Sequence, residues 1–249
     1  MSGFQSQVNN MPAPAVTGDF ASANPRASAI GGPGYFVAPA SGIQVGAFAW
    51  VANNGTVGGP GLLSQPSVSA PAFTAPQVFI GRGGQMAVWY NLLQQSGLSI
   101  PEGYPVTAYE AGDFWMGGCV TAASGGQKIF ASTISPGVIA TGASGSNPEG
   151  ASFTGAIAVT TGVLTVSAVA SGTIVPGMQI TGAGVPADTF IQSQLSGTTG
   201  GDGTYQTNTT TAVSSESLTG SQFAETKWYV AAGFTCNANE LVKASSYGP

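Results

Sequence analysis

Histidine is absent from the 249 residues of the chain. In enzymes, histidine is the most frequent general base, and it completes both the Ser-His-Asp and the Cys-His nucleophilic systems. Imidazole is also a common metal ligand. The absence of histidine excludes each of these arrangements.

Charged residues are scarce as well. Asp, Glu, Lys and Arg make up 6% of the sequence, whereas they make up about 25% of ordinary soluble proteins. Five basic residues against ten acidic ones give a net charge of -5. Such a chain has no cationic stripe for a phosphate backbone or an anionic bilayer. We therefore expect neither nucleic acid nor a membrane as a partner.

The chain has two cysteines, Cys119 and Cys236. They lie far apart in the sequence and lack the close CxxC spacing of a zinc site. We predict two reduced, buried thiols, with a disulfide as the alternative. No other pattern of metal ligands is evident, and the sequence predicts no metal and no cofactor.

The sequence is rich in apolar residues, which make up 43% of it. This content separates the chain from disordered proteins and predicts a folded protein with Trp50, Trp115 and Trp228 in its core. Thirty-eight glycines and sixteen prolines divide the apolar residues into short runs. These runs predict strands at residues 77–80, 105–109 and 127–130, and a strand at 43–50 that changes its buried face or carries a bulge. Residues 86–93 favour a short helix.

Residues 155–175 carry no charge and are about long enough to span a bilayer. Within them, Leu164 and Val166 alternate with Thr165 and Ser167, and a Pro-Gly pair follows at 176–177. Alternation with period two, ended by turn residues, predicts strands rather than a membrane helix.

Composition divides the chain into three parts. Residues 1–17 are rich in Asn, Gln, Ser and Pro and predict an extended N-terminal arm. Residues 151–220 are rich in Thr, Ser, Gly, Val and Ile with regular turn signals, which predicts a compact all-β module. Residues 18–150 and 221–249 share an aromatic, lightly charged character, so we interpret them as one main β domain. The predicted fold is all-β, with the module inserted in a loop and projecting outward.

Two carboxylate pairs could in principle hydrolyse glycosides, namely Glu110 with Asp113 and Glu102 with Glu110. Glu110 and Asp113 flank Ala-Gly, which is typical of a tight turn, so we predict solvated turn carboxylates. The Gly-rich stretch at 81–84 lacks the Gly-Lys-Ser/Thr of a nucleotide loop, and we interpret it as a turn that presents Arg82. The sequence predicts no catalytic residue.

Three pieces of the sequence resemble the structural cement proteins that decorate the capsids of tailed bacteriophages. These pieces are GDFASANPRAS at 18–28, GGPG at 31–34 and VGAFAW at 45–50. The similarity continues through IPEGYPVT at 100–107, EAGDFW at 110–115 and ETKWYV at 225–230. Residues 155–218 resemble a Thr/Gly-rich β module that is added to phage virion proteins.

The resemblance implies a jelly-roll or β-barrel-like main domain that sits on the coat lattice as a small symmetric oligomer, a dimer or a trimer. The implied partners are the major capsid protein and other copies of the chain, and the implied location is the outer surface of the virion. The N-terminal residues MSGFQSQ do not form a secretory signal peptide, so we expect synthesis in the host cytoplasm.

On this reading the protein is not an enzyme, and it binds the outside of the assembled head and stabilises it. The alternatives are a tail-fibre or host-surface-binding virion component and, less favoured, a carbohydrate-active enzyme. Candidate residues of the coat or subunit interface are Arg26, Asp19, Asn24 and Arg82. Arginine is enriched in interface hot spots, so we expect Arg26 to pair with a carboxylate of the coat or of a sister subunit. An intrachain bond from Arg26 to Asp19 is the alternative.

Overall fold

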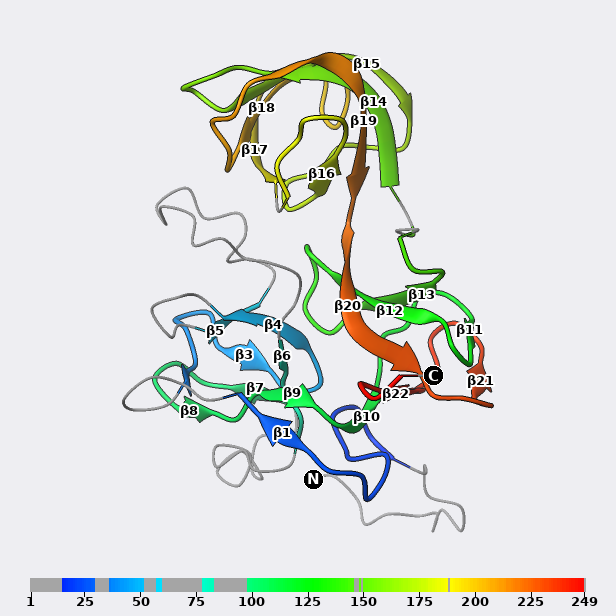
Figure 1. Cartoon of the computed structure of the whole chain (residues 1–249). Helices are drawn as coiled ribbons and strands as arrows, with labels where there is room; N and C mark the ends of the chain where they lie inside the picture. The colour runs from blue at the N-terminus through cyan, green and yellow to red at the C-terminus, as the bar shows by residue number, and fades with distance from the viewer. Residues whose placement is uncertain are drawn as a thin grey trace, which may run out of the picture.

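The computed structural model describes residues 15–29, 36–51, 57–59, 78–82, 98–145, 148, 150–187 and 189–248 (Figure 1). These residues form strands, turns and loops, and none of them is helical, so the predicted all-β class is confirmed. The described part of the chain accordingly has no helix that could span a membrane. Most of the expected N-terminal arm and the expected helix at 86–93 lie outside the described residues.

The first of two five-stranded sheets comes from the N-terminal half of the chain. Its strand order is β1 (Ala27–Ser28), β9 (Tyr109–Ala111), β6 (Val78–Phe79), β4 (Phe48–Val51) and β5 (Val57–Gly58). Two small ladders flank it, β2 (Phe36–Val37) with β8 (Pro105–Val106) and β3 (Ile43–Gln44) with β7 (Ser99–Ile100). The run predicted as one strand at 43–50 is therefore two strands, because Gly46 turns the chain with a φ of +84°.

The second sheet joins segments from the middle and the end of the chain. Its order is β10 (Asp113–Met116), β22 (Val242–Ser245), β20 (Phe223–Val230), β12 (Lys128–Ser132) and β13 (Ile139–Gly142), and β11 (Ala123–Ser124) pairs separately with β21 (Thr235–Cys236). Along β20, residues 224, 226, 228 and 230 are buried and the residues between them are not, which is the period of a half-buried strand. Both sheets contribute to one aromatic core, with Phe48 and Phe79 from the first and Phe114 and Trp228 from the second.

Residues 150–221 form a closed barrel. Its strands follow the order β14 (Gly150–Ile157), β15 (Val163–Ser171), β18 (Gly203–Thr207), β17 (Thr189–Gly197), β16 (Gln179–Thr181) and β19 (Val213–Ser221). A separate apolar cluster that includes Phe153, Leu164 and Tyr205 fills it. The uncharged stretch at 155–175 lies in β14, β15 and their connections, so the prediction of strands there is confirmed. Its alternation ends after Val166, because the register between β14 and β15 shifts at this point.

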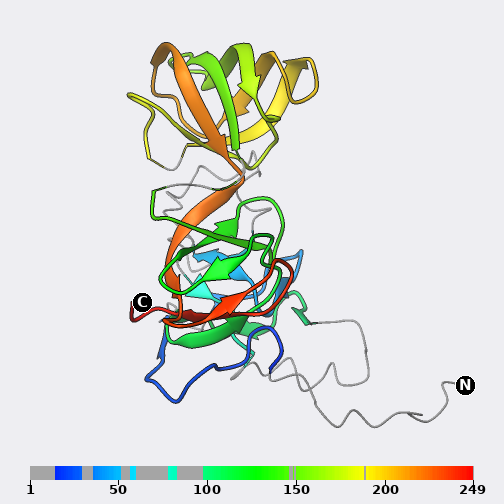
Figure 2. The ribbon, with the colours of Figure 1, turned by 90° about the vertical axis from the view of Figure 1, so that its right-hand side faces the viewer.

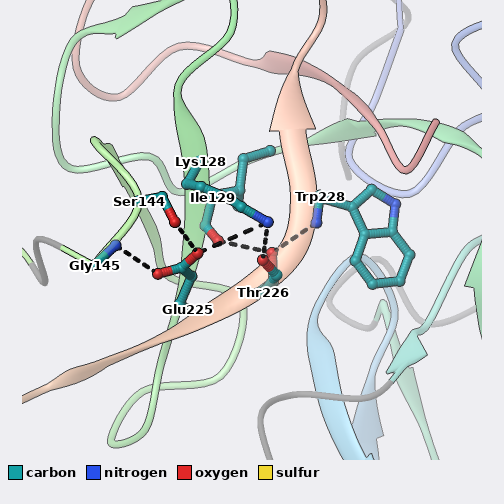
Figure 3. Close-up of polar contacts among 7 residues, drawn as sticks. All are labelled: Lys128, Ile129, Ser144, Gly145, Glu225, Thr226 and Trp228. Carbon is teal, nitrogen blue, oxygen red and sulfur yellow. Dashed lines mark hydrogen bonds and ion pairs between the residues drawn. The ribbon is translucent and has the colours of Figure 1, made fainter. Parts of the chain in front are cut away.

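One carboxylate joins the two connections between the barrel and the sheets (Figure 3). The chain leaves the barrel from β19 directly into β20, as Figures 1 and 2 show. Glu225 of β20 accepts hydrogen bonds from the Ser144 hydroxyl at 2.7 Å and from the Gly145 amide at 2.8 Å. Because Ser144 and Gly145 precede the barrel, Glu225 ties the entering segment to the leaving strand. The Lys128 ammonium lies 3.7 Å from the same carboxylate.

β20 carries a bulge at residues 226–228, and Trp228 of this bulge lies in the shared core. Lys128 faces Tyr229 and Phe130 faces Glu225, so residues 226–228 of β20 oppose Ile129 alone. The Thr226 hydroxyl donates to the Ile129 carbonyl at 2.7 Å and accepts from the Trp228 amide at 3.1 Å (Figure 3). This side chain thereby satisfies backbone groups that the interrupted ladder leaves without partners.

Candidate functional site

The conspicuous motif at residues 18–28 begins as an edge segment along β10. Phe20 forms a β-bridge with Phe114. The amide of Trp115 donates to the Asp19 carbonyl at 2.9 Å, and the amide of Ala21 donates to the Asp113 carbonyl at 2.9 Å. Beyond this ladder the chain rises to the surface, where residues 23–28 are all exposed. We call residues 22–26, which lead into β1, the signature loop.

Arg26 lies over an aromatic ring at the base of the signature loop. Its guanidinium carbon is 3.8 Å from the centre of the Phe20 ring. Phe20 in turn packs against Tyr109 and Phe114, with ring centres 5.8 and 5.5 Å away. Burial raises the pKa of Tyr109, and the positive charge of Arg26 acts in the opposite direction. Within the described residues Arg26 forms no salt bridge, so its planar fork is available to an external carboxylate.

Asp19 pairs with Arg82 rather than with Arg26. The Arg82 guanidinium is 3.6 Å from one Asp19 oxygen, and both side chains are partly exposed. The other Asp19 oxygen accepts from the Val16 amide at 3.1 Å. The intrachain alternative for Arg26 was therefore wrong, because the fold brings Arg82 from a distant turn to the carboxylate. Two of the four predicted interface residues form this pair, while Asn24 and Arg26 lie in the signature loop.

Asn24 is bound to a buried carboxylate. Its side-chain amide donates to Asp113 Oδ2 at 2.6 Å, and the Ser22 hydroxyl donates to the same oxygen at 2.6 Å. Asp113 is only 7% exposed, so the prediction of a solvated turn carboxylate was wrong for this residue. The turn signal belongs to Gly112, whose φ is +141°, and Asp113 already begins β10. Glu110, by contrast, is exposed as predicted.

Tyr247 completes this surface and was missed by the sequence reasoning. Its hydroxyl donates to the Pro25 carbonyl at 2.6 Å across a separation of 222 residues, and 54% of the residue is exposed. The preceding Ser246 accepts a hydrogen bond from the Gly112 amide at 2.8 Å. No local signal marks such a contact, because it exists only once β22 has joined β10. We call Asn24, Pro25, Arg26 and Tyr247 the loop surface.

The remaining chemistry-bearing groups form no further site in the described residues. Cys119 and Cys236 are free thiols; Cys119 is buried in the core between the sheets as predicted, whereas Cys236 is only partly buried against it. Burial raises the pKa of the Cys236 thiol. The described residues contain no cluster of His, Cys, Asp and Glu suited to a metal ion. Trp50 and Trp228 are buried as predicted, whereas Trp115 is only partly buried, beside Phe234.

A family model described as XM1 gp53 minor capsid protein matches residues 4–179. The match covers more than half of the chain and includes the whole motif of the signature loop. It continues into the barrel and ends at the first residue of β16. Neither the curated proteins nor the solved structures contain a match to the chain.

Proposed function

Because the chain belongs to the XM1 gp53 minor capsid protein family, we propose that it is a cement protein that binds the outside of the assembled phage head. A ligand that bridges several coat subunits, and binds only their assembled arrangement, stabilises that arrangement by mass action. Many copies per shell add avidity, so each contact can be modest. No catalytic step is required. The proposed partners are the major capsid protein and sister copies in a dimer or trimer.

The observation that carries this proposal is the exposed and well-supported loop surface. Arginine and tyrosine are the residue types most enriched in interface hot spots, and rigid support reduces the entropy lost on binding. Arg26 rests on Phe20, and Tyr247 is held by its hydrogen bond to Pro25. We propose that Arg26 pairs with a carboxylate of the coat, with Tyr247 packing beside it.

The arrangement of the molecule supports a division of roles. β1 and the signature loop lie at one end of the molecule, and the barrel lies at the other end in both views (Figures 1 and 2). If the loop surface faces the coat, the barrel points away from the shell. We therefore propose that residues 18–150 and 221–249 bind the capsid, that residues 1–17 extend along a neighbouring subunit, and that residues 151–220 project outward.

Removal of the barrel separates capsid binding from any role in host adsorption. Gly150 and Ser221 are direct cross-strand partners, so their α-carbons are about 5 Å apart, and a Gly-Gly linker can replace residues 151–220. We expect the whole chain and the shortened chain to cosediment with expanded capsids that lack the protein, to the same number of copies per shell. Both should raise the temperature at which those capsids open. If neither cosediments, the proposal fails; if only the whole chain binds bare host cells, the host-surface alternative gains the barrel as its working part.

Replacement of Arg26 tests the contact itself. We expect Arg26→Ala to weaken capsid binding about tenfold, because it removes a charge-assisted contact of about 1.4 kcal/mol. Arg26→Lys should restore only part of the affinity, because lysine keeps the charge but lacks the planar fork. Lys227→Ala on β20 makes the same change in net charge outside the signature loop and serves as the control. Equal binding by Arg26→Ala and wild type in a titrated cosedimentation would remove Arg26 from the interface.

A further inference from the structure

We propose that Asp113 is a positioning residue, whose buried carboxylate holds the signature loop in the conformation that presents Arg26 to the coat. This inference rests on the proposed function and names a residue below the surface on which the contact depends. Asp113 itself is almost fully covered, so it acts through the loop rather than by touching the partner.

Two hydrogen bonds to Asp113, and a third between the residues that donate them, fix the path of the loop. Ser22 and Asn24 both donate to Oδ2, each at 2.6 Å. The backbone N–H of Asn24 also donates to the Ser22 hydroxyl at 3.0 Å, which closes a small ring of polar groups. Together these bonds determine the direction of the chain from residue 22 to residue 24, immediately before Pro25 and Arg26.

The other carboxylate oxygen indicates that stability alone does not explain Asp113. Oδ1 is buried and has no hydrogen-bond partner among the described residues. A buried carboxylate oxygen without a partner is unfavourable, and buried ionic groups often stabilise a fold less than apolar residues of similar size. A neutral side chain at this position would avoid that penalty. A role in fixing the conformation of the signature loop would explain why a carboxylate is present here.

The two residues next to Asp113 in the sequence contact or lie beneath the Arg26 side chain. At Gly112, a Cβ atom would lie 3.2 Å from Cγ of Arg26, so the glycine lets the arginine side chain pass close to the backbone. Phe114 packs under Phe20, which lies under the guanidinium. Three consecutive residues, 112–114, therefore seat Arg26: the first gives it room, the second directs its loop, and the third supports its aromatic platform.

A double-mutant cycle on capsid affinity tests the inference. We expect Asp113→Ala to weaken binding about tenfold, as Arg26→Ala does, and the double variant to bind no more than about twofold more weakly than either single variant. A residue that acts only through global stability would give effects that multiply. Val230→Ala, a core truncation in β20 that leaves the loop intact, is the stability control and should retain wild-type affinity.

Limited trypsin digestion provides a second readout that needs no capsid. Cleavage after Arg26 requires the signature loop to open, whereas cleavage after Lys227 within β20 requires the sheet to open. We expect Asp113→Ala to accelerate the first cleavage about tenfold relative to the second. If Asp113→Ala does not fold, the combined Ser22→Ala and Asn24→Ala variant removes the same hydrogen bonds and takes its place in both experiments.

The outcomes separate this inference from the proposed function. Failure of the wild-type chain to bind capsids overturns the proposed function and this inference with it. If wild type binds and Arg26→Ala does not, wild-type affinity of Asp113→Ala overturns the positioning role alone. The same holds if the effects of the two substitutions multiply, or if the ratio of the two cleavage rates stays at its wild-type value.

Discussion

Trp228→Ala is expected to lower the free energy of unfolding by about 3 to 5 kcal/mol, the usual range for truncating a fully buried large aromatic residue. Trp228 is 0% exposed, and its ring centre lies 5.3 Å from that of Phe48. Because Phe48 belongs to the first sheet and Trp228 to the second, the cavity would open in the core that both sheets share. Chemical denaturation should show a lower midpoint with an unchanged slope.

Two variants bracket this expectation. Trp115→Ala removes a ring that is only partly buried beside Phe234, so it should be clearly less destabilising. Trp228→Phe keeps much of the buried volume and removes an indole N–H that has no hydrogen-bond partner in the described residues, so it too should be milder than Trp228→Ala. Equal losses for Trp228→Ala and Trp115→Ala would contradict the assignment of Trp228 to the shared core.

Gly117→Ala should destabilise the chain by about 1 to 3 kcal/mol through overpacking. A Cβ atom at Gly117 would collide with the Thr17 hydroxyl, and a Cβ at Gly46 would collide with the methyl group of the same threonine. Thr17 therefore lies between two glycines and seats the start of the motif against both sheets. Gly46→Ala should be about 1 kcal/mol worse than Gly117→Ala, because its φ of +84° adds backbone strain.

Thr17→Ala provides the internal control for this pair. It removes the colliding atoms, so it should rescue Gly117→Ala almost completely and Gly46→Ala only in part, since the strain at residue 46 remains. The measurement is the thermal unfolding midpoint of Gly46→Ala and Gly117→Ala, each with and without Thr17→Ala. Thr17→Ala alone is the reference for the double variants. If Thr17→Ala restored the stability of both glycine variants fully, or restored the stability of neither, this packing around Thr17 would be contradicted.

The predicted features that proved correct were those encoded by neighbouring residues. Short apolar runs ended by Gly and Pro indicated strands, and alternation such as that of Leu164 and Val166 distinguished a strand from a membrane helix. The motif at 18–28 stood out because many unusual residues lie side by side. Such signals are local, so they survive without any knowledge of how the strands pair.

The errors concern pairs of residues that only the pairing of strands brings together. Arg26, seven positions away, was considered as the salt-bridge partner of Asp19. The partner is instead Arg82, which lies on a separate turn. Asp113 was judged from its neighbour Gly112, yet its carboxylate is hydrogen-bonded by Ser22 and Asn24, which lie about ninety residues earlier. In each case a distant segment, rather than the local pattern, determined the environment of the carboxylate.

The sequence by itself determined the class of the protein: an all-β chain without histidine, poor in charge, that matches a minor capsid protein family. Only the tertiary structure decided that residues 150–221 close into a barrel and that Tyr247 meets Pro25. It also decided that a buried carboxylate underlies the exposed loop. The physical reason is that neighbouring residues determine where strands form. The order of strands in a sheet, the closure of a barrel and the partners of side chains depend instead on contacts between segments far apart in the chain.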